Sequence, residues 1–288
     1  VRLLHERDIG VNYLTTAKDK IQKSEKYSGF FWNPSTGEID LESLQGIGTI
    51  VHLAGSSIFK PWTQKNKEEI IRSRVESAEL LFQTLKSNDH KVGQIVSASG
   101  ISVYPSSYTN LYFEDEKDTA ATFLGKLVRE WEAAADKFTD LGLRVATIRT
   151  GLVLSEKGGA LEQMKRPVSY GVGAALGNGK QWQSWIHQED LARIYLYVIR
   201  HGLEGAYNAV APDPVTNAEL MQAIAREEGK KIRLPNVPAF ALKLIMGEMA
   251  NVALESQLVA SRKIQHAGFS FKFVNLVKTL KDLRLREK

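Results

Sequence analysis

A nearly continuous apolar run and a second segment that repeats its strand pattern, each followed by small residues, constrain the fold of this chain most strongly. Residues 49–54 (TIVHLA) stop at Gly55, and residues 94–97 (QIVS) stop at Ala98-Ser99-Gly100. Apolar runs of this length are typical of strands in a parallel sheet that helices cover on both faces. We therefore expect a buried parallel sheet whose strands end in small residues.

Amphipathic helices separate the predicted strands. Residues 63–85 carry apolar side chains that are spaced for one helix face, and residues 124–138 repeat this pattern. Three more apolar strands are expected, over residues 11–14, 30–32 and 143–148. The repeated alternation of strand and helix predicts an α/β fold with a Rossmann-like, doubly wound parallel sheet.

The regular alternation ends near Gly151. Later segments predict helices over residues 188–200 and 240–246 and a strand over residues 207–210, while Thr216 and Glu219 have the spacing of a capping box. We predict a nucleotide-fold core over residues 1–155. A smaller C-terminal α/β lobe with a helical extension is expected over residues 156–288, and some of its segments return to the core.

The composition narrows the function classes. The chain has 288 residues, 38 of them Lys or Arg, 33 Asp or Glu and none Cys, with a net charge of +5. Well-mixed charge weighs against a nucleic-acid partner, and the lack of Cys excludes disulfides, thiolate zinc sites and a cysteine nucleophile. Without an apolar run of about 18 residues or a signal segment, we expect a cytoplasmic protein with no membrane partner. The six histidines show no metal-binding spacing, so no metal is expected.

Four short motifs follow the predicted strands in order. They are Val51-His-Leu-Ala-Gly55, Ser97-Ala-Ser-Gly100 with Tyr104 behind it, Arg149-Thr-Gly-Leu-Val-Leu154 and Trp185-Ile-His-Gln-Glu-Asp190. In this order and spacing they resemble the motifs of the extended short-chain dehydrogenases, within the NAD-dependent epimerase/dehydratase superfamily. The resemblance covers essentially the whole chain.

Further matches narrow the resemblance to the "epimerase family protein" subgroup, whose members are also described as sugar-nucleotide epimerases or cell-division inhibitors. The matching segments are Trp62, Arg72-Ser-Arg74, Trp131-Glu-Ala-Ala-Ala135, Gly177-Asn-Gly179, Gln181-Trp182, Pro238-Ala-Phe240, Gly247-Glu-Met-Ala250 and Gly268-Phe-Ser-Phe271.

The resemblance implies a dinucleotide site along the strand ends. It suggests that NAD(P) lies against a set of residues made up of Thr16, Lys18, Leu53, Ala54, Gly55, Arg74, Ser97, Ala98, Lys126, Arg149 and Thr150. For Arg74 and Lys126, a surface salt bridge and an ordinary solvated lysine are the alternatives. The partners expected are therefore a dinucleotide and a small-molecule substrate.

The resemblance also implies residues for substrate chemistry. Ser99 is expected to hydrogen-bond a substrate oxygen, unless it only closes a strand, and Tyr104 offers a phenol for acid–base work, unless it only packs. Trp185 and His187 are expected at the wall of the substrate pocket. A buried hydrogen-bonding role is the alternative for this histidine.

Two departures from the family pattern stand out. Family members open with a strand and a G-x-x-G-x-x-G turn that binds the cofactor pyrophosphate at a helix N-terminus, and this chain shows no such turn. Because residues 2–7 resemble the end of an amphipathic helix, we expect the missing first strand and glycine-rich loop upstream of Val1. The family's Tyr-x-x-x-Lys pair is also missing. Thr122 and Lys126 fit its two places best, but a threonine hydroxyl is too weak an acid to replace a phenol.

The end of the second strand gives a clue to the cofactor. An NAD-preferring site carries an acidic residue there for the ribose 2′-hydroxyl, whereas this chain has Leu14-Thr-Thr-Ala-Lys18. A nearby lysine tolerates a 2′-phosphate, which slightly favours NADP. A plain polar turn is the alternative interpretation.

Two functions remain open at this point. The first is an NAD(P)-dependent epimerase/dehydratase or oxidoreductase that acts on a small hydroxylated or nucleotide-linked substrate. The second is a catalytically silent dinucleotide-binding protein with a regulatory role, which the missing Tyr-x-x-x-Lys pair favours.

Overall fold

The computed structural model describes residues 1–286 and divides into two compact units. Unit 1 comprises Val1–Ser99, Leu127–Ile148 and Tyr195–Ala206, and unit 2 comprises Gly100–Lys126, Arg149–Ile194 and the chain from Tyr207 onward. The chain thus passes several times between the units. The predicted division at residue 155 differs from this arrangement, because residues 100–126 lie in unit 2. Residues 195–206 are a segment of the predicted C-terminal lobe that lies in unit 1.

A four-stranded sheet lies mainly in unit 1. Its strands β5 (Thr49–His52), β6 (Gln94–Gly100), β8 (Arg144–Thr150) and β12 (Gly205–Ala209) lie in the order β12-β8-β6-β5. The pair β5–β6 is parallel, as predicted, and its register places His52 opposite Ser97. The buried Gln94 side chain donates to the carbonyls of Val198 and Leu203, 3.3 and 3.2 Å away, which fastens the returning segment to β6.

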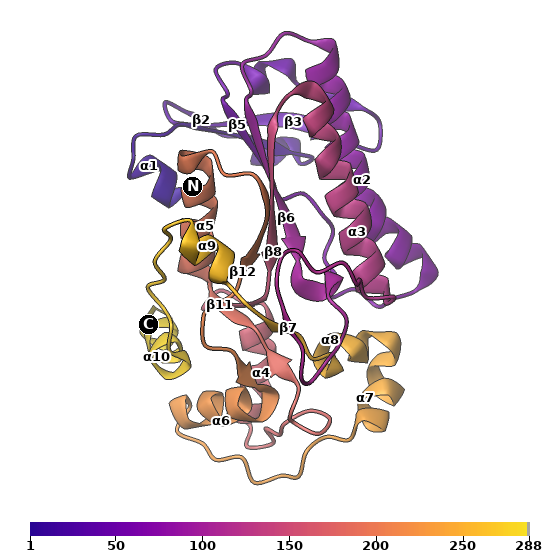
Figure 1. Cartoon of the computed structure of the whole chain (residues 1–288), viewed down its shortest axis with the longest axis vertical. Coiled ribbons are helices and arrows are strands. Elements are labelled where there is room, and N and C mark those ends of the chain that lie inside the picture. Colours follow the sequence, from indigo (N-terminus) through magenta and orange to yellow (C-terminus); the bar gives the residue numbers. More distant parts are fainter. Residues whose placement is uncertain (287–288) are drawn as a thin grey trace. The chain divides into compact units, whose positions relative to one another are not determined.

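Two helices pack beside this sheet, α2 (Gln64–Ser87) and α3 (Phe123–Asp136), and they run next to each other in Figure 1. The Thr63 hydroxyl caps α2 by accepting the Asn66 N–H at 3.2 Å. The core of unit 1 combines the apolar faces of both helices with strand residues. Its buried members include Trp32, Ala78, Leu81, Phe82, Leu85, Ile95, Ala134, Ala135, Phe138 and Val145.

A second sheet in unit 1 has β1 (Val11–Thr15) parallel to β3 (Tyr27–Asn33), with β2 (Lys23–Ser24) and β4 (Glu38–Ile39) antiparallel to β3. Among residues 1–286, no strand hydrogen-bonds to both β1 and β5. In a doubly wound sheet the counterparts of these two strands flank a central strand. Among the described residues, β1 and β5 thus belong to two separate sheets.

Unit 2 is built from short strand pairs and helices. The parallel pairs are β9 (Leu152–Leu154) with β11 (Trp185–His187), and β7 (Leu111–Tyr112) with β14 (Leu258–Val259). The pair β10 (Trp182–Gln183) with β13 (Val215–Thr216) is antiparallel. The helices are α4 (Ala160–Ser169), α5 (Gln188–His201, continuing into unit 1), α6 (Asn217–Glu227), α7 (Ala239–Met246), α8 (Asn251–Leu254), α9 (Arg262–His266) and α10 (Leu276–Arg286).

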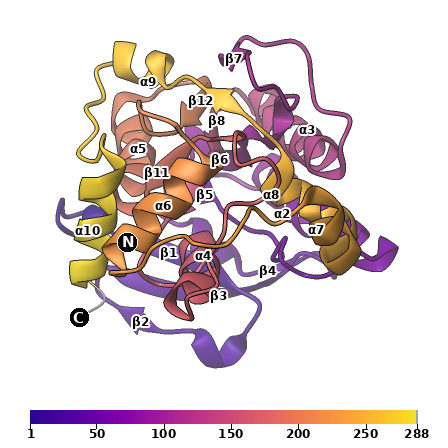
Figure 2. The same ribbon diagram turned by 90° about the horizontal axis from the view of Figure 1, so that it is seen from below.

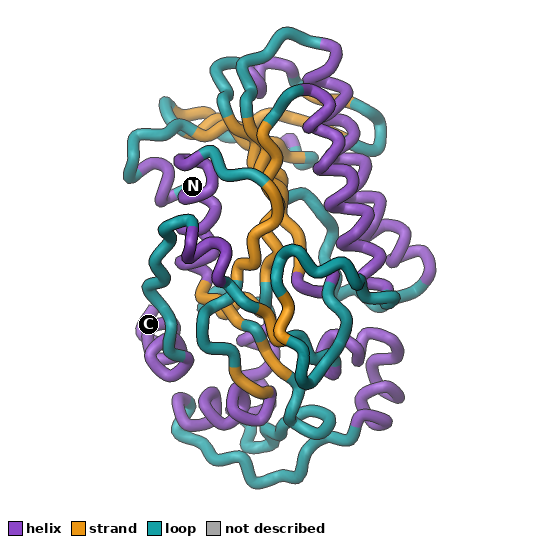
Figure 3. Tube along the Cα trace, in the orientation of Figure 1, coloured by secondary structure: helices purple, strands orange, loops and turns teal. Residues whose placement is uncertain are grey.

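The core of unit 2 lies where α4, α6 and α10 pack against β9 and β11, and Figure 2 shows α6 beside α10. Its buried members include Leu154, Leu161, Trp185, Leu220, Ile224, Leu276, Leu280 and Leu283. Figure 3 shows the long loop that connects α6 to α7. Within residues 1–286, no helix is both long enough and apolar enough to cross a membrane.

The remaining elements are short. The helix α1 covers Arg2–His5, so it is shorter than the predicted helix over residues 2–7. Single 3-10 turns occupy Lys18–Lys20, Leu41–Leu44, Ile101–Val103, Lys137–Leu141 and Gly247–Ala250. The predicted α/β class and all the longer predicted helices and strands are confirmed, with ends that shift by a few residues.

The capping box at the start of α6 gives a test of local stability. The Thr216 hydroxyl accepts the Glu219 N–H at 3.3 Å, and the Glu219 carboxylate accepts the Thr216 N–H at 2.7 Å. We expect Thr216→Ala to lower the free energy of unfolding by about 1 kcal/mol in urea denaturation, because the Glu219 backbone N–H loses its partner. Gln222→Ala, on the exposed face of the same helix, should change it by less than about 0.5 kcal/mol. Equal effects of the two substitutions would contradict the capping argument.

Candidate functional site

The strand ends of unit 1 carry most of the predicted dinucleotide residues. Behind β5, Leu53 is 63% exposed and Gly55 is also exposed. Behind β1, Thr16 and Lys18 are exposed, and the Lys18 ammonium lies 4.5 Å from the centre of the Phe31 ring. Open backbone next to polar side chains is what a dinucleotide site of this fold requires.

Ser99 is the last residue but one of β6, its side chain is buried, and its hydroxyl donates to the Glu132 carboxylate of α3 at 2.5 Å. A serine hydroxyl has one proton, so this bond leaves Ser99 only as an acceptor for a substrate O–H. The predicted contact of Ser99 with a substrate oxygen stays a prediction. Sequence reasoning did not identify the role of Glu132, although its segment belongs to a motif that resembles the family.

Arg74 belongs to α2, and its side chain is a buried cation beside the residues that follow β5. It is 8% exposed, its guanidinium lies 4.8 Å from the centre of the Trp131 ring, and a Cβ added at Gly55 would come within 2.7 Å of its Cζ. Its Nη1 donates to the carbonyls of Ile70 and Ser56, whereas its buried Nε has no hydrogen-bond partner among the described residues. Burial lowers the pKa of Arg74, because no carboxylate offsets the cost of desolvating the charge.

A neutral histidine lies beside this cation. The imidazole of His52, 2% exposed, is hydrogen-bonded to Ser77 Oγ at 2.8 Å through Nε2 and to Ser97 Oγ at 3.3 Å through Nδ1. Burial and the Arg74 charge lower its pKa to about 4. His52 is therefore uncharged near neutral pH, so the Arg74 guanidinium is the charged member of this pair. Ser97 is fully buried and supports His52, and Ala98 is partly buried.

Tyr104, in unit 2, is 1% exposed and its hydroxyl is fully engaged. The phenol donates to Asn208 Oδ1 at 2.8 Å and accepts from Arg149 Nη1 at 3.0 Å. Burial raises the pKa of Tyr104 to about 12, although Arg149 and Asn208 oppose the shift. These contacts weigh against the predicted acid–base role, because the phenol proton is held by an amide and leaves only at high pH.

Asn208 organises the surroundings of Tyr104. Its side-chain amide donates to the Ala260 carbonyl at 3.0 Å, and its backbone N–H donates to the Glu114 carboxylate at 2.9 Å. Arg149 donates to the Glu114 carbonyl at 3.1 Å, so the guanidinium is oriented by Glu114 and Tyr104 together. Neither Glu114 nor Asn208 was predicted, since no local pattern links them.

The start of α3 holds Thr122 and Lys126. The Gly125 N–H donates to the Thr122 hydroxyl at 3.3 Å, and the Lys126 side chain is exposed. A Cβ added at Gly125 would collide with the Ala120 carbonyl oxygen, so this close approach requires glycine. Burial raises the pKa of Glu255, which sequence reasoning missed, although Gln257 and Thr122 oppose the shift.

Trp185 and His187 are fully buried within unit 2. The Trp185 indole donates to the Asp213 carbonyl at 2.9 Å. His187 stacks on Phe273 with ring centres 3.7 Å apart, and its Nδ1 accepts the Glu189 N–H at 3.0 Å. Burial and then the charge of Arg286 lower the pKa of His187. Both side chains make structural contacts, and their contact with a substrate stays a prediction.

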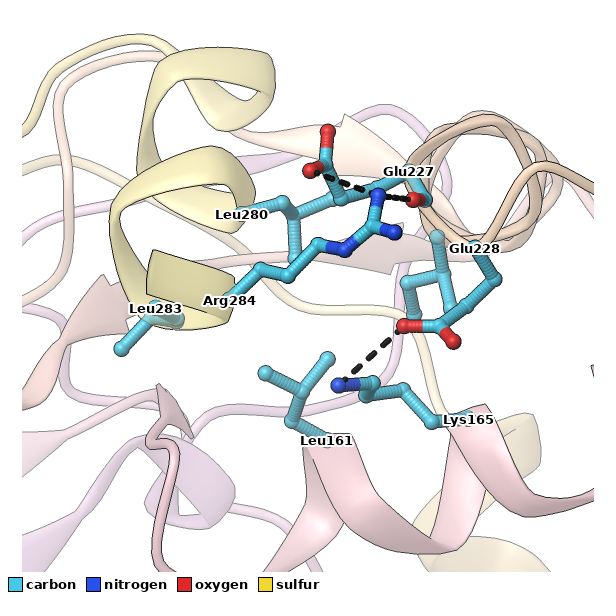
Figure 4. Close-up of a pocket in the computed structure, with 8 residues that line it drawn as sticks. Leu161, Lys165, Glu227, Glu228, Leu280, Leu283 and Arg284 are labelled. Atoms are coloured by element: carbon cyan, nitrogen blue, oxygen red, sulfur yellow. Dashed lines mark hydrogen bonds and ion pairs between the residues drawn. The ribbon is translucent and has the colours of Figure 1, made fainter. Parts of the chain in front are cut away.

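A small pocket in unit 2 lies between α4, α6 and α10 (Figure 4). Its charged groups pair with one another, because Lys165 Nζ lies 3.2 Å from Glu228 Oε1 and Arg284 Nη1 lies 3.3 Å from Glu227 Oε1. The residues that line this pocket therefore offer little to a polar ligand. The strand ends of unit 1 and the Tyr104 network of unit 2 are the better candidates.

Two family models match the sequence. The model described as "NAD dependent epimerase/dehydratase family" matches residues 38–209, and "Domain of unknown function (DUF1731)" matches residues 237–283. The chain is 36% identical over 271 residues to "Epimerase family protein SAR0825" of Staphylococcus aureus (strain MRSA252), with 94% of this chain and 89% of that protein covered. It is 35% identical over 275 residues to "Epimerase family protein SERP0438" of Staphylococcus epidermidis, with the same shares covered.

Solved structures show the same fold. The human epimerase family protein SDR39U1 (isoform 2), crystallised with NADPH, matches with a TM-score of 0.84 at 28% identity, covering 98% of this chain and 93% of that one. The nucleoside-diphosphate sugar epimerase of Corynebacterium glutamicum matches with a TM-score of 0.70 at 28% identity, covering 90% and 50%. A UDP-N-acetylglucosamine 4-epimerase of Bacillus cereus, at 18% identity and a TM-score of 0.75, shares the fold over 100% of this chain and 94% of its own.

The buried imidazole of His52 predicts a pH dependence of stability. Its pKa is lowered from 6.5 in the unfolded chain to about 4 in the folded protein, so protons bind the unfolded chain first as the pH falls. The stabilisation is present above pH 6.5 and is lost as the pH falls towards 4, by up to about 3 kcal/mol. We expect His52→Asn to flatten the curve of unfolding free energy against pH over this interval.

His266→Asn serves as the control, because His266 is exposed. Urea unfolding at a series of pH values should give the wild-type slope for this variant. Parallel curves for the wild type and His52→Asn would show that His52 titrates alike in the folded and unfolded chains.

Proposed function

Because this chain belongs to the NAD-dependent epimerase/dehydratase family, we propose that it binds NAD(P) and oxidises or epimerises a small hydroxylated or nucleotide-linked substrate. The family gives the nicotinamide dinucleotide as the cofactor class. We propose in addition that NADP is slightly favoured over NAD and that the substrate belongs to the class just named.

The observation that carries the proposal is the buried Arg74 cation at the end of β5. Its guanidinium has no carboxylate partner among the described residues, and its Nε makes no hydrogen bond. An uncompensated buried charge is costly to fold, and an anion that binds next to it recovers part of that cost. A dinucleotide or a nucleotide-linked substrate supplies such an anion as phosphate.

The remaining predicted residues fit a dinucleotide in outline. Leu53, Ala54 and Gly55 present open backbone for its adenosine half, and exposed Thr16 and Lys18 suit a ribose 2′-phosphate. This favours NADP slightly, in line with the NADPH in the human relative's structure. Ser97 and Ala98 of unit 1, and Lys126, Arg149 and Thr150 of unit 2, remain proposed dinucleotide residues. When bound, the nicotinamide exchanges hydride with a substrate carbon.

The substrate is proposed from the relatives and from the strand-end chemistry. Neighbouring structures are described as complexes with UDP-glucose or UDP-glucuronic acid and NAD. We propose that Ser99 accepts a hydrogen bond from a substrate hydroxyl. For Trp185 and His187, which are fully buried within unit 2, a place behind the wall of a substrate pocket is a separate proposal. A nucleoside-diphosphate sugar is thus the first substrate class to test.

The engaged phenol of Tyr104 favours a second candidate function. A protein of this fold whose tyrosine is bound to Asn208 and Arg149 would keep the dinucleotide without turning it over. Calorimetric titration with NADPH and NADH tests binding, which both functions require. Turnover across nucleotide sugars and carbonyl compounds separates them, since the silent binder shows none.

Replacing Arg74 tests the anion site. We expect Arg74→Met to weaken NADPH binding roughly 10- to 100-fold, since charge-assisted hydrogen bonds contribute about 1.5–3 kcal/mol. The free energy of unfolding without ligand should stay level or rise, because a buried charge is removed. The control is Arg72→Met, because Arg72 is exposed and its Nε lies 3.5 Å from Glu76 Oε1. This variant should bind NADPH with the wild-type affinity. Unchanged NADPH affinity in Arg74→Met would exclude Arg74 from the site.

Replacing Ser99 tests the substrate contact. Ser99→Ala removes the bond to Glu132, for which we expect a loss of about 1 kcal/mol in unfolding free energy. Turnover should fall by more than this loss explains, roughly 10-fold or more in kcat/KM, because a substrate partner is lost as well. Ser35→Ala in an exposed turn is the control. A turnover loss no larger than the control's would remove Ser99 from the proposal.

A further inference from the structure

Several large apolar side chains of unit 2 are exposed on α7, on the α4 loop (residues 170–177) and on the α7 loop (residues 229–238). The set, which we call the apolar surface, consists of Tyr170, Val172, Leu234, Phe240, Leu244 and Ile245. Its three members on α7 are 75%, 85% and 81% exposed, in chain order. Single exposed apolar residues need no explanation, whereas a contiguous group of them marks an interaction site.

The two loops of the apolar surface lie side by side. Leu176 of the α4 loop forms a parallel β-bridge with Val237 of the α7 loop. Nearer to α4, a Cβ added at Gly173 would come within 3.2 Å of Ile232 Cδ1. Figure 2 shows the α7 loop running towards α7, which begins directly after it. The two loops and α7 therefore form one continuous part of unit 2.

Buried neighbours hold α7 in place without the exposed apolar side chains. Leu242 is 8% exposed, and Ala250 in the turn after α7 is fully buried. The backbone N–H groups of Ala241 and Leu242 donate to the Pro238 carbonyl at 3.0 and 3.2 Å. The exposed apolar residues of α7 thus contribute little to packing within the chain, and they remain accessible to a partner.

Positive charge accompanies the apolar surface. The cations of the α7 loop and of α7 are Lys230, Lys231, Arg233 and Lys243. All four side chains are exposed, and within residues 1–286 none of them forms a hydrogen bond or an ion pair. Residues 229–247 contain no Asp or Glu, and neither does the α4 loop. The preceding carboxylate, Glu228, is paired with Lys165 at 3.2 Å.

This combination fits a membrane surface better than it fits a protein. Protein–protein interfaces are depleted of Lys, whereas segments that lie in the interface of a bilayer combine exposed Phe and Leu with Lys and Arg. A symmetric contact between two copies joins the same patch of each, so the excess positive charge of one copy would face that of the other.

We propose that the apolar surface of unit 2 contacts the headgroup region of an anionic lipid bilayer. The apolar side chains enter the boundary between headgroups and acyl chains, and the four cations lie at the level of the lipid phosphates. A contact of this kind requires no spanning helix. It therefore revises the expectation of no membrane partner, which was based on the lack of a spanning apolar run.

Binding to lipid vesicles tests the contact. Wild-type protein is sedimented with vesicles of phosphatidylcholine that contain about 30 mol% phosphatidylglycerol, and with vesicles of phosphatidylcholine alone. We expect the affinity for the anionic vesicles to be at least about 10-fold higher, since the cations are attracted to the negative surface. Added salt should weaken this binding, because it screens exposed charges.

A double substitution tests the apolar part of the surface. Phe240→Ser with Leu244→Ser should weaken binding to the anionic vesicles roughly 10-fold or more, because apolar area no longer enters the bilayer. The matched control is Val277→Ser with Leu285→Ser, since these residues of α10 are 57% and 63% exposed. Both double variants should keep the wild-type urea midpoint, because the side chains are exposed.

A triple substitution tests the charged part. The variant combines Lys230→Gln, Lys231→Gln and Arg233→Gln. The control loses the same number of charges in unit 1, where exposed side chains are replaced by Lys20→Gln, Lys86→Gln and Lys91→Gln. We expect the variant to weaken binding to the anionic vesicles roughly 10- to 100-fold, and the control to stay within about threefold of the wild type.

A fluorescent label reports directly on the position of α7. Because the chain has no cysteine, Leu244→Cys can carry a single environment-sensitive fluorophore. Its emission should shift to shorter wavelength when anionic vesicles are added, since the label enters an apolar medium. The same label on Val277→Cys of α10 should show no shift.

The outcomes decide between the possible partners. A wild type that does not bind the anionic vesicles, or binds both kinds equally, overturns the membrane contact, as does unchanged binding by Phe240→Ser with Leu244→Ser. A dimer in sedimentation velocity without lipid, which this double variant dissociates, assigns the surface to a second copy and also overturns it. None of these readouts involves NADPH or turnover, so failure of the proposed function is detected separately.

Discussion

The parallel pairing of β5 with β6 is the constraint on which the candidate site of unit 1 depends. Its register brings His52 and Ser97 together, and the hydroxyl of Ser77 completes the set from α2. A shift by one residue would turn His52 to the other face of the sheet. The burial of the His52 imidazole therefore depends on this ladder of hydrogen bonds. Arg74 lies beside it because α2, which carries both Ser77 and Arg74, packs where β5 ends.

In unit 2 the comparable constraint is the satisfaction of buried polar groups. Asn208 uses its amide and its backbone to bond Tyr104, Ala260 and Glu114, which come from three separate stretches of the chain. Such a network is stable only when every member has a partner. The hydroxyl of Tyr104 accordingly donates its proton to Asn208 and accepts a hydrogen bond from Arg149.

The sequence predicted the framework well, because apolar periodicity, strand-end glycines and the capping box are local signals. The helix from residue 64 and the strands at residues 49 and 94 needed only their own residues to be recognised. Glu132 and Asn208 escaped prediction, since each acquires its role from a partner at least 33 residues away. The motif of Ser97–Gly100 and Tyr104 placed this tyrosine just after β6. It did not predict that the Tyr104 hydroxyl would donate to Asn208.

The C-terminal helix α10 bears on how this family can evolve. The second family model ends at residue 283, and Leu276, Leu280 and Leu283 of that region fill the same core as Leu154 and Trp185. The segment that the second family model covers therefore does not have a hydrophobic core separate from that of the preceding residues. Recombination between relatives could exchange this segment only together with the apolar surfaces of α4 and α6 that pack against it. We therefore expect substitutions in α10 to be accompanied by substitutions in α4 and α6.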